Sequence, residues 1–392
     1  MIPRTLEPVL KKLAGQYPVV TVTGPRQSGK TTLCRAVFPD KPYVNLERPD
    51  VRDFANSDPR GFLASNADGA ILDEIQRVPQ LVSYLQPLVD ERQRPGQFIL
   101  TGSQQFEVMT TITQSLAGRT ALLKLLPLSI EELSGAGMKP DSDALLLTGF
   151  YPRIYDAGIN PTQALGDYLG TYVERDIRQL ISIKNLTLFE RFIRLCAGRI
   201  GQLVNLQSLG NDVGISHTTA RSWLTLLEAS YVVFQLRPWH TNISKRQIKT
   251  TKLYFYDVGL ASYLLGIERK SHVNRHPLRG KLFENMVVIE ALKYRYHRGR
   301  RSNLWFWRDA KGNEVDLIIE NGADIAAVEI KAGATISSDY FKGLHTFNAR
   351  LDAPARVCAL VYDGQERQQR SDVTVWCAGD ISELMQRIDA KN

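Results

Sequence analysis

Short apolar runs alternate with helix-like stretches in the first third of the chain. The apolar runs cover residues 18–24, 42–47, 69–74, 96–102 and 120–128, and helical patterns fall near 30–37, 79–93 and 104–116. Nearly continuous apolar strands separated by helices are typical of a parallel sheet with helices on both faces. We therefore predict an α/β domain with a parallel sheet over residues 1–140, and a linker in the Gly-, Pro- and Asp-rich stretch 135–143.

The next part of the chain, residues 141–268, is first mostly helical, with a helical pattern over 162–199. Apolar residues then repeat at helical spacing from Leu206 to Val213, Gly214 can end that helix, and Ser216 can cap a second one. The strand-like runs YVVFQL and KLYFYD follow. Two helices joined by a turn and followed by a strand pair predict a winged helix-turn-helix domain.

The last part, residues 269–392, predicts a mixed α/β domain. A helical pattern over 281–296 precedes strands at 304–308 and 315–320, and a turn at 320–322 leads into a strand at 325–331. A helix at 337–348 and strands at 356–362 and 373–376 complete the pattern. We expect a hairpin at the centre of this domain.

The strongest motif follows the first predicted strand and matches G-x-x-x-x-G-K-T without a gap. Its residues, together with the next threonine, are Gly24, Pro25, Arg26, Gln27, Ser28, Gly29, Lys30, Thr31 and Thr32. Glycines let successive N–H groups turn toward phosphate oxygens, and the helix N-terminus adds a favourable dipole. The motif predicts a phosphate loop for ATP, in which Lys30 reaches the β- and γ-phosphates and Thr31 offers its hydroxyl to Mg²⁺.

Acidic and polar residues end the two neighbouring apolar runs. Asp73 and Glu74 close the run AILDE, so we expect Asp73 to hold Mg²⁺ and Glu74 to orient and deprotonate the attacking water. Thr101 and Ser103 end the run FILTGS, and either of them can sense the γ-phosphate. The sequence does not choose between the two.

A second set of charged residues lies in the predicted C-terminal domain. Glu329 and Lys331 are two apart on one predicted strand and therefore share a face, and Asp316 on the paired strand can approach that face. Two carboxylates can hold Mg²⁺, Lys331 can position or activate water, and Glu284 can add a ligand from the helix. Asp316 and Glu329 are the candidate metal ligands of this set.

Composition and charge narrow the functional classes. The chain has 392 residues, 43% of them hydrophobic and 23% charged, which is ordinary for globular domains and excludes a disordered or collagen-like chain. The apolar runs are shorter than the roughly 18 residues that a membrane span needs, and four cysteines without a C-x-x-C pair fit a reducing cytoplasm.

The net charge of +8 is unevenly distributed along the chain. Residues 269–308 hold eleven Lys or Arg and only two Glu, and aromatic and basic residues alternate in KYRYHRGRRSNLWFWR. This stretch is either a solvated basic surface or a phosphate-binding face with stacking aromatic rings. On the second helix of the predicted winged helix, His217, Thr218 and Arg221 are candidates for contacts in a DNA groove.

The whole chain resembles AAA-type ATPases of bacteria and archaea in which the ATPase is followed by a winged helix and a C-terminal domain of unknown function. The resemblance rests on GPRQSGKTTL, ILDEIQ, LTGS, SLAGR, PLSIEEL, GFYPR, YVERDI and KLYFYDVGL, in this order. It implies that Arg119 of SLAGR is an arginine finger supplied to a neighbouring subunit, and therefore a homo-oligomer. Arg153 or Arg175 could instead contact nucleotide from the lid.

The order of Glu284, Asp316, Glu329 and Lys331 resembles the core of restriction-endonuclease-like nucleases. The two resemblances together imply a Mg²⁺-dependent ATPase that associates with DNA and whose nuclease-like domain cleaves it under ATPase control. The alternative is a nucleotide-switched module that binds DNA or protein without cleaving, in a defence or toxin–antitoxin-like role.

Overall fold

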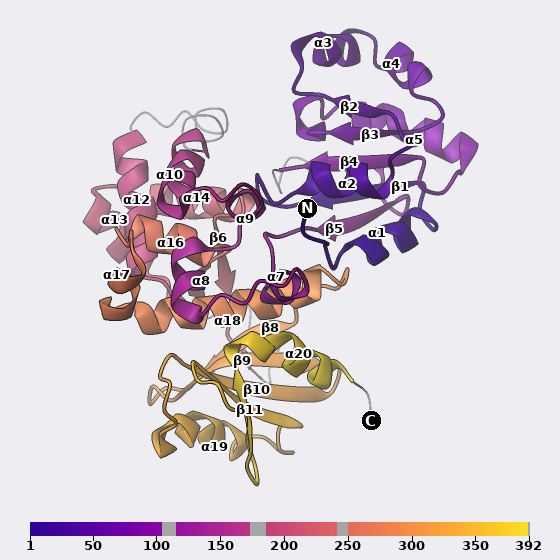
Figure 1. The fold of residues 1–392 in the computed structure, drawn as a ribbon. Helices are drawn as coiled ribbons and strands as arrows, with labels where there is room; N and C mark the ends of the chain where they lie inside the picture. Colours follow the sequence, from indigo (N-terminus) through magenta and orange to yellow (C-terminus); the bar gives the residue numbers. More distant parts are fainter. Residues whose placement is uncertain (104–114, 173–185, 241–249, 391–392) are drawn as a thin grey trace. The chain divides into compact units, whose positions relative to one another are not determined.

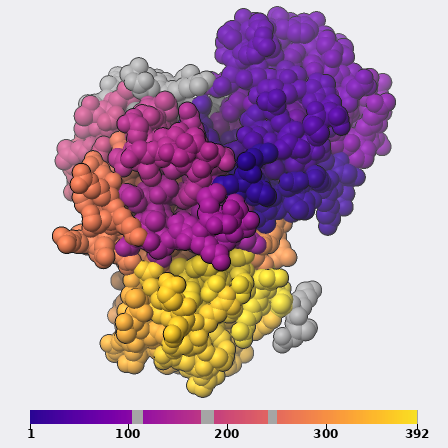
Figure 2. All heavy atoms as spheres, in the orientation of Figure 1, coloured from indigo at the N-terminus to yellow at the C-terminus, as the bar shows by residue number. Residues whose placement is uncertain are grey.

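The computed structural model describes residues 1–103, 115–172, 186–240 and 250–390. Its elements form two compact units. The first consists of Met1–Leu128, Ala229–Tyr231 and Arg295–Arg301, and the second of Ser129–Glu228, Val232–Tyr294 and Ser302–Asn392. Figure 1 shows the fold coloured along the chain, and Figure 2 shows all heavy atoms as spheres in the same colours. No helix in the described ranges has both the length and the apolar character to cross a membrane.

The first unit is built on a parallel five-stranded sheet in the order β2-β3-β4-β1-β5. Its strands are β1 (Val19–Thr23), β2 (Tyr43–Asn45), β3 (Ala70–Asp73), β4 (Phe98–Gly102) and β5 (Thr120–Lys124). The α/β fold with a parallel sheet, predicted from the apolar runs, is therefore confirmed. Because β4 lies between β1 and β3, the residues that follow β4 end beside both the phosphate loop and Asp73.

Helices cover both faces of this sheet. The helices are α1 (Glu7–Ala14), α2 (Lys30–Val37), α3 (Pro49–Ser57), α4 (Pro59–Ser65) and α5 (Leu81–Arg92). Neighbouring residues of β3 divide between the faces, with Ile71 packing in the cluster of α1 and α2 and Leu72 in the cluster of α4 and α5. Of the predicted helix at 104–116, residues 104–114 lie outside the described residues. The helices α1, α3 and α4 were not predicted from the sequence.

Two short segments from later in the chain complete the first unit. The Tyr231 hydroxyl donates to Thr23 Oγ1 over 3.0 Å, at the end of β1. The N–H of Leu126 donates to Nε2 of the buried His297 over 3.2 Å. The basic stretch predicted as one surface is thus divided, since Arg295–Arg301 belong to the first unit and Ser302 begins the next part of the second.

The second unit begins with helices and one strand pair. Its elements are α7 (Ile130–Gly135), α8 (Ser142–Thr148), α9 (Pro152–Ala157), α10 (Pro161–Tyr172), α12 (Leu186–Gly198), α13 (Leu206–Val213), α14 (His217–Ala229), β6 (Val233–Leu236), β7 (Lys252–Phe255), α16 (Val258–Leu264) and α17 (Lys270–Arg275). Gly214 follows α13 with a φ of 87°, and Ser216 Oγ accepts from the N–H of Thr219 over 3.1 Å. The helix pair and the antiparallel β6–β7 pair lie where the sequence predicted them.

The unit ends with a mixed six-stranded sheet in the order β12-β13-β11-β10-β9-β8. The strands are β8 (Leu304–Arg308), β9 (Glu314–Asn321), β10 (Asp324–Lys331), β11 (Val357–Tyr362), β12 (Gln368–Gln369) and β13 (Thr374–Cys377), and the helices are α18 (Arg279–Tyr296), α19 (Lys342–Asn348) and α20 (Ile381–Asp389). The expected hairpin is β9–β10, turned at Gly322 with a φ of 68°. The predicted helix at 337–348 begins as a 3₁₀ turn, Ser338–Phe341.

Candidate functional site

The glycine-rich loop is shaped by glycines in conformations that other residues avoid. Gly24 follows β1 with a φ of 150°, and a Cβ there would lie 2.0 Å from the carbonyl oxygen of Leu125. Gly29 has a φ of 91° and caps α2, which begins at Lys30. Gln27 is also left-handed, with a φ of 58°. The loop therefore leads directly into a helix N-terminus, which is the arrangement that binds phosphate.

The Lys30 ammonium lies inside this loop. It donates to the carbonyl oxygens of Gly24 over 3.0 Å and Pro25 over 2.7 Å. Burial lowers the pKa of Lys30, while the nearby Glu74 and Asp73 oppose that shift. The Ser28 hydroxyl is buried in the same loop without a hydrogen-bond partner in the described part of the chain. A compact cation among backbone groups is suited to an anionic ligand.

Asp73 is the centre of the polar contacts next to the loop. Its carboxylate accepts from Thr31 Oγ1 over 2.9 and 3.1 Å, from the Tyr43 hydroxyl over 2.7 Å, and from Thr101 Oγ1. A hydroxyl beside a buried carboxylate is the type of oxygen donor set that Mg²⁺ prefers. Thr31 and Asp73, both predicted as metal ligands, are therefore brought together. Tyr43 was missed, because a tyrosine in an apolar run carries no motif.

Glu74 directly follows Asp73 in a left-handed conformation, with a φ of 59° that is uncommon for a non-glycine residue. Its N–H donates to Thr101 Oγ1 over 3.3 Å. Its carboxylate accepts from Ser103 Oγ over 3.2 Å and from the side-chain amide of Gln76. Thr101 thus contacts Asp73 and Ser103 contacts Glu74, so both candidates for the γ-phosphate sensor lie at the site.

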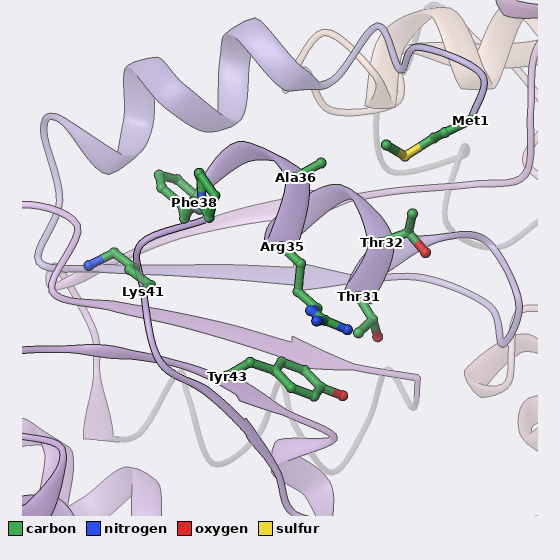
Figure 3. Close-up of a pocket in the computed structure, with 9 residues that line it drawn as sticks. Met1, Thr31, Thr32, Arg35, Ala36, Phe38, Lys41 and Tyr43 are labelled. Atoms are coloured by element: carbon green, nitrogen blue, oxygen red, sulfur yellow. The ribbon is translucent and has the colours of Figure 1, made fainter.

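A pocket of about 470 Å³ borders Thr31. Figure 3 shows Thr31 and Thr32 from the start of α2 facing it together with Arg35 and Tyr43. The Arg35 guanidinium lies 4.8 Å from the centre of the Tyr43 ring. Lys41 adds a second cation to the lining, so the pocket beside the loop has a basic character.

Arg119 lies away from the phosphate loop of its own chain. It forms a two-pronged ion pair with Asp90 of α5, with N–O distances of 2.5 and 2.8 Å. The Arg119 carbonyl oxygen accepts from the N–H of Val19, the first residue of β1. The phosphate loop follows Thr23, at the other end of the same strand. The two ends of β1 are four residue steps apart, which corresponds to roughly 13 Å.

Of the two arginines named as alternatives to Arg119, the structure describes only Arg153. Arg153 is exposed on α9 in the second unit, and Arg175 lies outside the described residues with most of the YVERDI motif.

The second predicted set of charged residues converges at the β9–β10 hairpin. The register pairs Val328 with Leu317, so Glu329 and Asp316, one residue further along each strand, lie opposite one another. Lys331 Nζ donates to Glu329 Oε1 over 2.5 Å, and Asp316 Oδ2 accepts from the N–H of Ile330 over 3.0 Å. Burial, and next the Asp316 charge, raise the pKa of Glu329 to about 8.

The fourth predicted member, Glu284 of α18, joins this set through a residue that the sequence analysis missed. Lys252 Nζ lies 3.0 Å from Glu284 Oε1, 2.5 Å from Glu314 Oε1 and 3.5 Å from Asp316 Oδ1. Burial alone would lower the pKa of Lys252, but Tyr254 and the carboxylates raise it well above its usual value. A lysine that opens the apolar strand KLYFYD was the available signal, since buried lysines are nearly always paired.

The face of α14 predicted for groove contacts borders a pocket of about 720 Å³. His217 and Arg221, four residues apart on the helix, line it together with Gln207 and Asn205 from the start of α13. Thr218 is not part of the lining and bonds to Ser216 through its hydroxyl over 2.8 Å. Lys293, expected on a basic surface, is instead fully buried and paired with Glu290 over 2.7 Å.

Comparisons with known proteins agree with the loop geometry. Residues 16–134 match the model of the AAA domain. This chain carries an AAA-type ATPase domain. Residues 139–271 and 279–381 each match a domain of unknown function, DUF8612 and DUF4143 respectively.

Relatives extend the similarity over nearly the whole chain. Uncharacterized proteins of Mycobacterium tuberculosis and Mycobacterium bovis are 32% identical over 375 residues, which is 95% of this chain and 82% of each relative. The chain therefore belongs to the same family of AAA-domain proteins.

Two solved structures show a weaker likeness. A Walker-type ATPase of Pyrococcus abyssi aligns with a TM-score of 0.43 and 17% identity, over 67% of this chain and 96% of that one. AMPPCP-bound DnaA from Aquifex aeolicus aligns with a TM-score of 0.29 and 13% identity, over 57% of this chain and 85% of that one.

Proposed function

We propose that the protein is a Mg²⁺-dependent ATP hydrolase whose nucleotide state controls how its second unit engages a nucleic-acid partner. The observation that carries the hydrolase is the contact between Thr31 and Asp73 over 2.9 Å, beside a loop that opens α2. A phosphate loop, a hydroxyl and an acidic strand end serve together in ATP hydrolysis. The AAA-domain match over the same residues supports this assignment.

Each residue of the site has a distinct role in the proposed reaction. The loop N–H groups and Lys30 bind the phosphates, and Thr31 and Asp73 hold Mg²⁺. Bound Mg²⁺ would neutralise charge on the β- and γ-phosphates. Glu74, oriented by Ser103 and Gln76, accepts a proton from the attacking water.

Two substitutions separate binding from hydrolysis. Lys30→Ala removes a phosphate-contacting cation, so ATP affinity should fall. Glu74→Gln keeps the shape of the side chain but loses the base, so ATP should stay bound while turnover falls about 100-fold or more. Fluorescent-nucleotide titration and phosphate release measure the two effects. Turnover near the wild-type rate in Glu74→Gln would show that another group is the base.

The proposed nucleic-acid partner is supported by the order of α13, α14, β6 and β7, two helices followed by an antiparallel strand pair, which is the order expected of a winged helix. His217 and Arg221 share one face of α14 beside the pocket that Asn205 and Gln207 also line. The second helix of such domains contacts DNA grooves. Arg221→Gln should therefore weaken duplex DNA binding and lower the salt slope by about one. Arg350→Gln, which changes an exposed arginine that pairs with Asp309, is the matched control. Equal affinity in both variants would indicate a protein partner.

Metal-dependent cleavage of DNA is the second candidate function. It is favoured by Glu329 Oε2, which is buried without a hydrogen-bond partner in the described residues, opposite Asp316 and next to Lys331. The order of these groups along the chain resembles the acidic core of restriction-endonuclease-like domains. The direct test is plasmid nicking with Mg²⁺ or Mn²⁺, with and without ATP, comparing wild type with Asp316→Ala. Cleavage that depends on Asp316 would establish the nuclease.

A further inference from the structure

The carboxylates that a nuclease would use for metal binding surround a lysine side chain. Lys252 is 1% exposed at the start of β7. Its ammonium lies within 3.5 Å of oxygens from Glu284, Glu314 and Asp316, which come from α18 and β9. The Phe306 ring closes another side, with its centre 5.5 Å from the ammonium. No set of three or more His, Cys, Asp and Glu positioned to hold a metal occurs in the described ranges.

We propose that the Lys252 ammonium is the resident cation of this acidic cluster and that it excludes divalent metal from Glu284 and Asp316. A buried carboxylate pair needs positive charge, and an ammonium at hydrogen-bond distance supplies it. A divalent cation at the same place would meet the positive charge of Lys252 within a few ångströms in a poorly screened environment. All of these groups belong to the second unit, and none of them is part of the proposed ATP site.

The individual oxygens support the same conclusion. Glu284 Oε1 accepts from Lys252 and, over 2.6 Å, from the Tyr254 hydroxyl, while Oε2 accepts from Lys281 over 2.6 Å. Asp316 Oδ2 is held by a backbone N–H. Mg²⁺ requires near-octahedral oxygen ligands at about 2.0–2.1 Å, and these oxygens are already engaged.

Glu329 Oε2 is the open position of the cluster. It is a single oxygen, and its partner Oε1 is bonded to Lys331. One carboxylate oxygen beside a lysine does not provide the several charged ligands that a tightly held Mg²⁺ needs. The cluster instead forms a network of ion pairs within the second unit. The network joins Lys252 of β7 to carboxylates of α18 and β9. This arrangement favours a binding module over a nuclease.

The experiment titrates nucleotide-free full-length protein with Mn²⁺ and follows the free ion by EPR. Wild type and Asp316→Asn should give the same Mn²⁺ titration, because no Mn²⁺ binds at Asp316 while Lys252 is present. Lys252→Gln leaves three carboxylates without their common cation, so it should gain one Mn²⁺ per chain at a site where wild type binds none. Asp316→Asn in that background should abolish the gain. Lys342→Gln, which removes an exposed lysine of the same sheet domain, should behave like wild type.

Two outcomes would overturn the proposal. One is Mn²⁺ binding by wild type that Asp316→Asn abolishes. The other is folded Lys252→Gln that binds no more Mn²⁺ than wild type. If Lys252→Gln fails to fold, the wild-type comparison with Asp316→Asn decides alone, because a resident lysine predicts that the two titrations coincide. Phosphate release from ATP is measured in parallel, so that a failure of the proposed ATP site can be distinguished from a failure of the Lys252 proposal.

Discussion

The Tyr43 hydroxyl donates to Asp73 Oδ2 over 2.7 Å, on the same carboxylate that accepts from Thr31. β2 and β3 are neighbours in the sheet, and Tyr43 is paired with Ile71, two residues before Asp73. The carboxylate is therefore fixed from two directions, by the helix that follows the loop and by an adjacent strand. Fixed ligands lose less entropy when a metal binds.

Tyr43→Phe should raise the Mg²⁺ concentration needed for half-maximal ATP hydrolysis. Loss of this partly buried hydrogen bond costs about 1 kcal/mol, which corresponds to roughly a fivefold increase. The rate at saturating Mg²⁺ should change little, because Thr31 and Asp73 remain. Tyr84→Phe, on the exposed side of α5, is the control. An unchanged Mg²⁺ requirement in Tyr43→Phe would remove this role for the hydroxyl.

Gln76→Ala should lower the rate of hydrolysis without weakening ATP binding. The amide of Gln76 contacts both Glu74 and Ser103, so its loss lets the carboxylate of the base turn away from the water. We expect about a tenfold fall in kcat, since misoriented bases lose much of the 10²–10⁴-fold that such groups contribute. Gln80→Ala, whose amide contacts Asn56 at the surface, should leave kcat unchanged. A loss of ATP affinity instead would mean that Gln76 shapes the phosphate loop.

Arg119→Ala should reduce hydrolysis only under conditions where chains associate. Within its own chain the guanidinium pairs with Asp90 at the opposite end of β1 from the loop, so its proposed partner is nucleotide on a neighbour. Wild-type rate per chain should rise with protein concentration, and mixing Arg119→Ala with Glu74→Gln should restore activity. Arg94→Ala, in an exposed pair with Asp68, is the control. A rate per chain that is independent of concentration contradicts the role.

Thermal stability should fall as the pH rises toward 8, and Glu329→Gln should flatten that fall. The pKa of Glu329 is raised from its ordinary value of 4.5 to about 8, so the folded protein binds its proton more tightly than the unfolded chain. Its contribution is therefore full below about pH 4.5 and is lost as the pH rises through about 8. Unfolding midpoints measured from pH 5.5 to 8.5 test this. Identical slopes in both proteins would mean that Glu329 is ionised across the range.

The sequence predicted those parts of the fold that rest on local pattern. The buried strands, the left-handed Gly214 and the hairpin at Gly322 each follow from properties of a few adjacent residues. The loop motif likewise located Lys30 and Thr31, and the acidic end of the run AILDE located Asp73. The partners of these residues come from distant positions, and such pairings depend on strand order and register, which one sequence does not reveal. Lys252 was overlooked for that reason, since the acids around it lie more than 30 residues away.

The segments Ala229–Tyr231 and Arg295–Arg301 have a practical consequence for dissecting the protein. A fragment ending at Leu128 contains the whole nucleotide loop but lacks the Tyr231 hydroxyl at Thr23 and the His297 ring at Leu126. No single continuous fragment therefore contains the whole of this unit and nothing else. Expression of the N-terminal fragment should give a poorly soluble product, and recombination that exchanges only the C-terminal portion would also remove part of the nucleotide-binding unit.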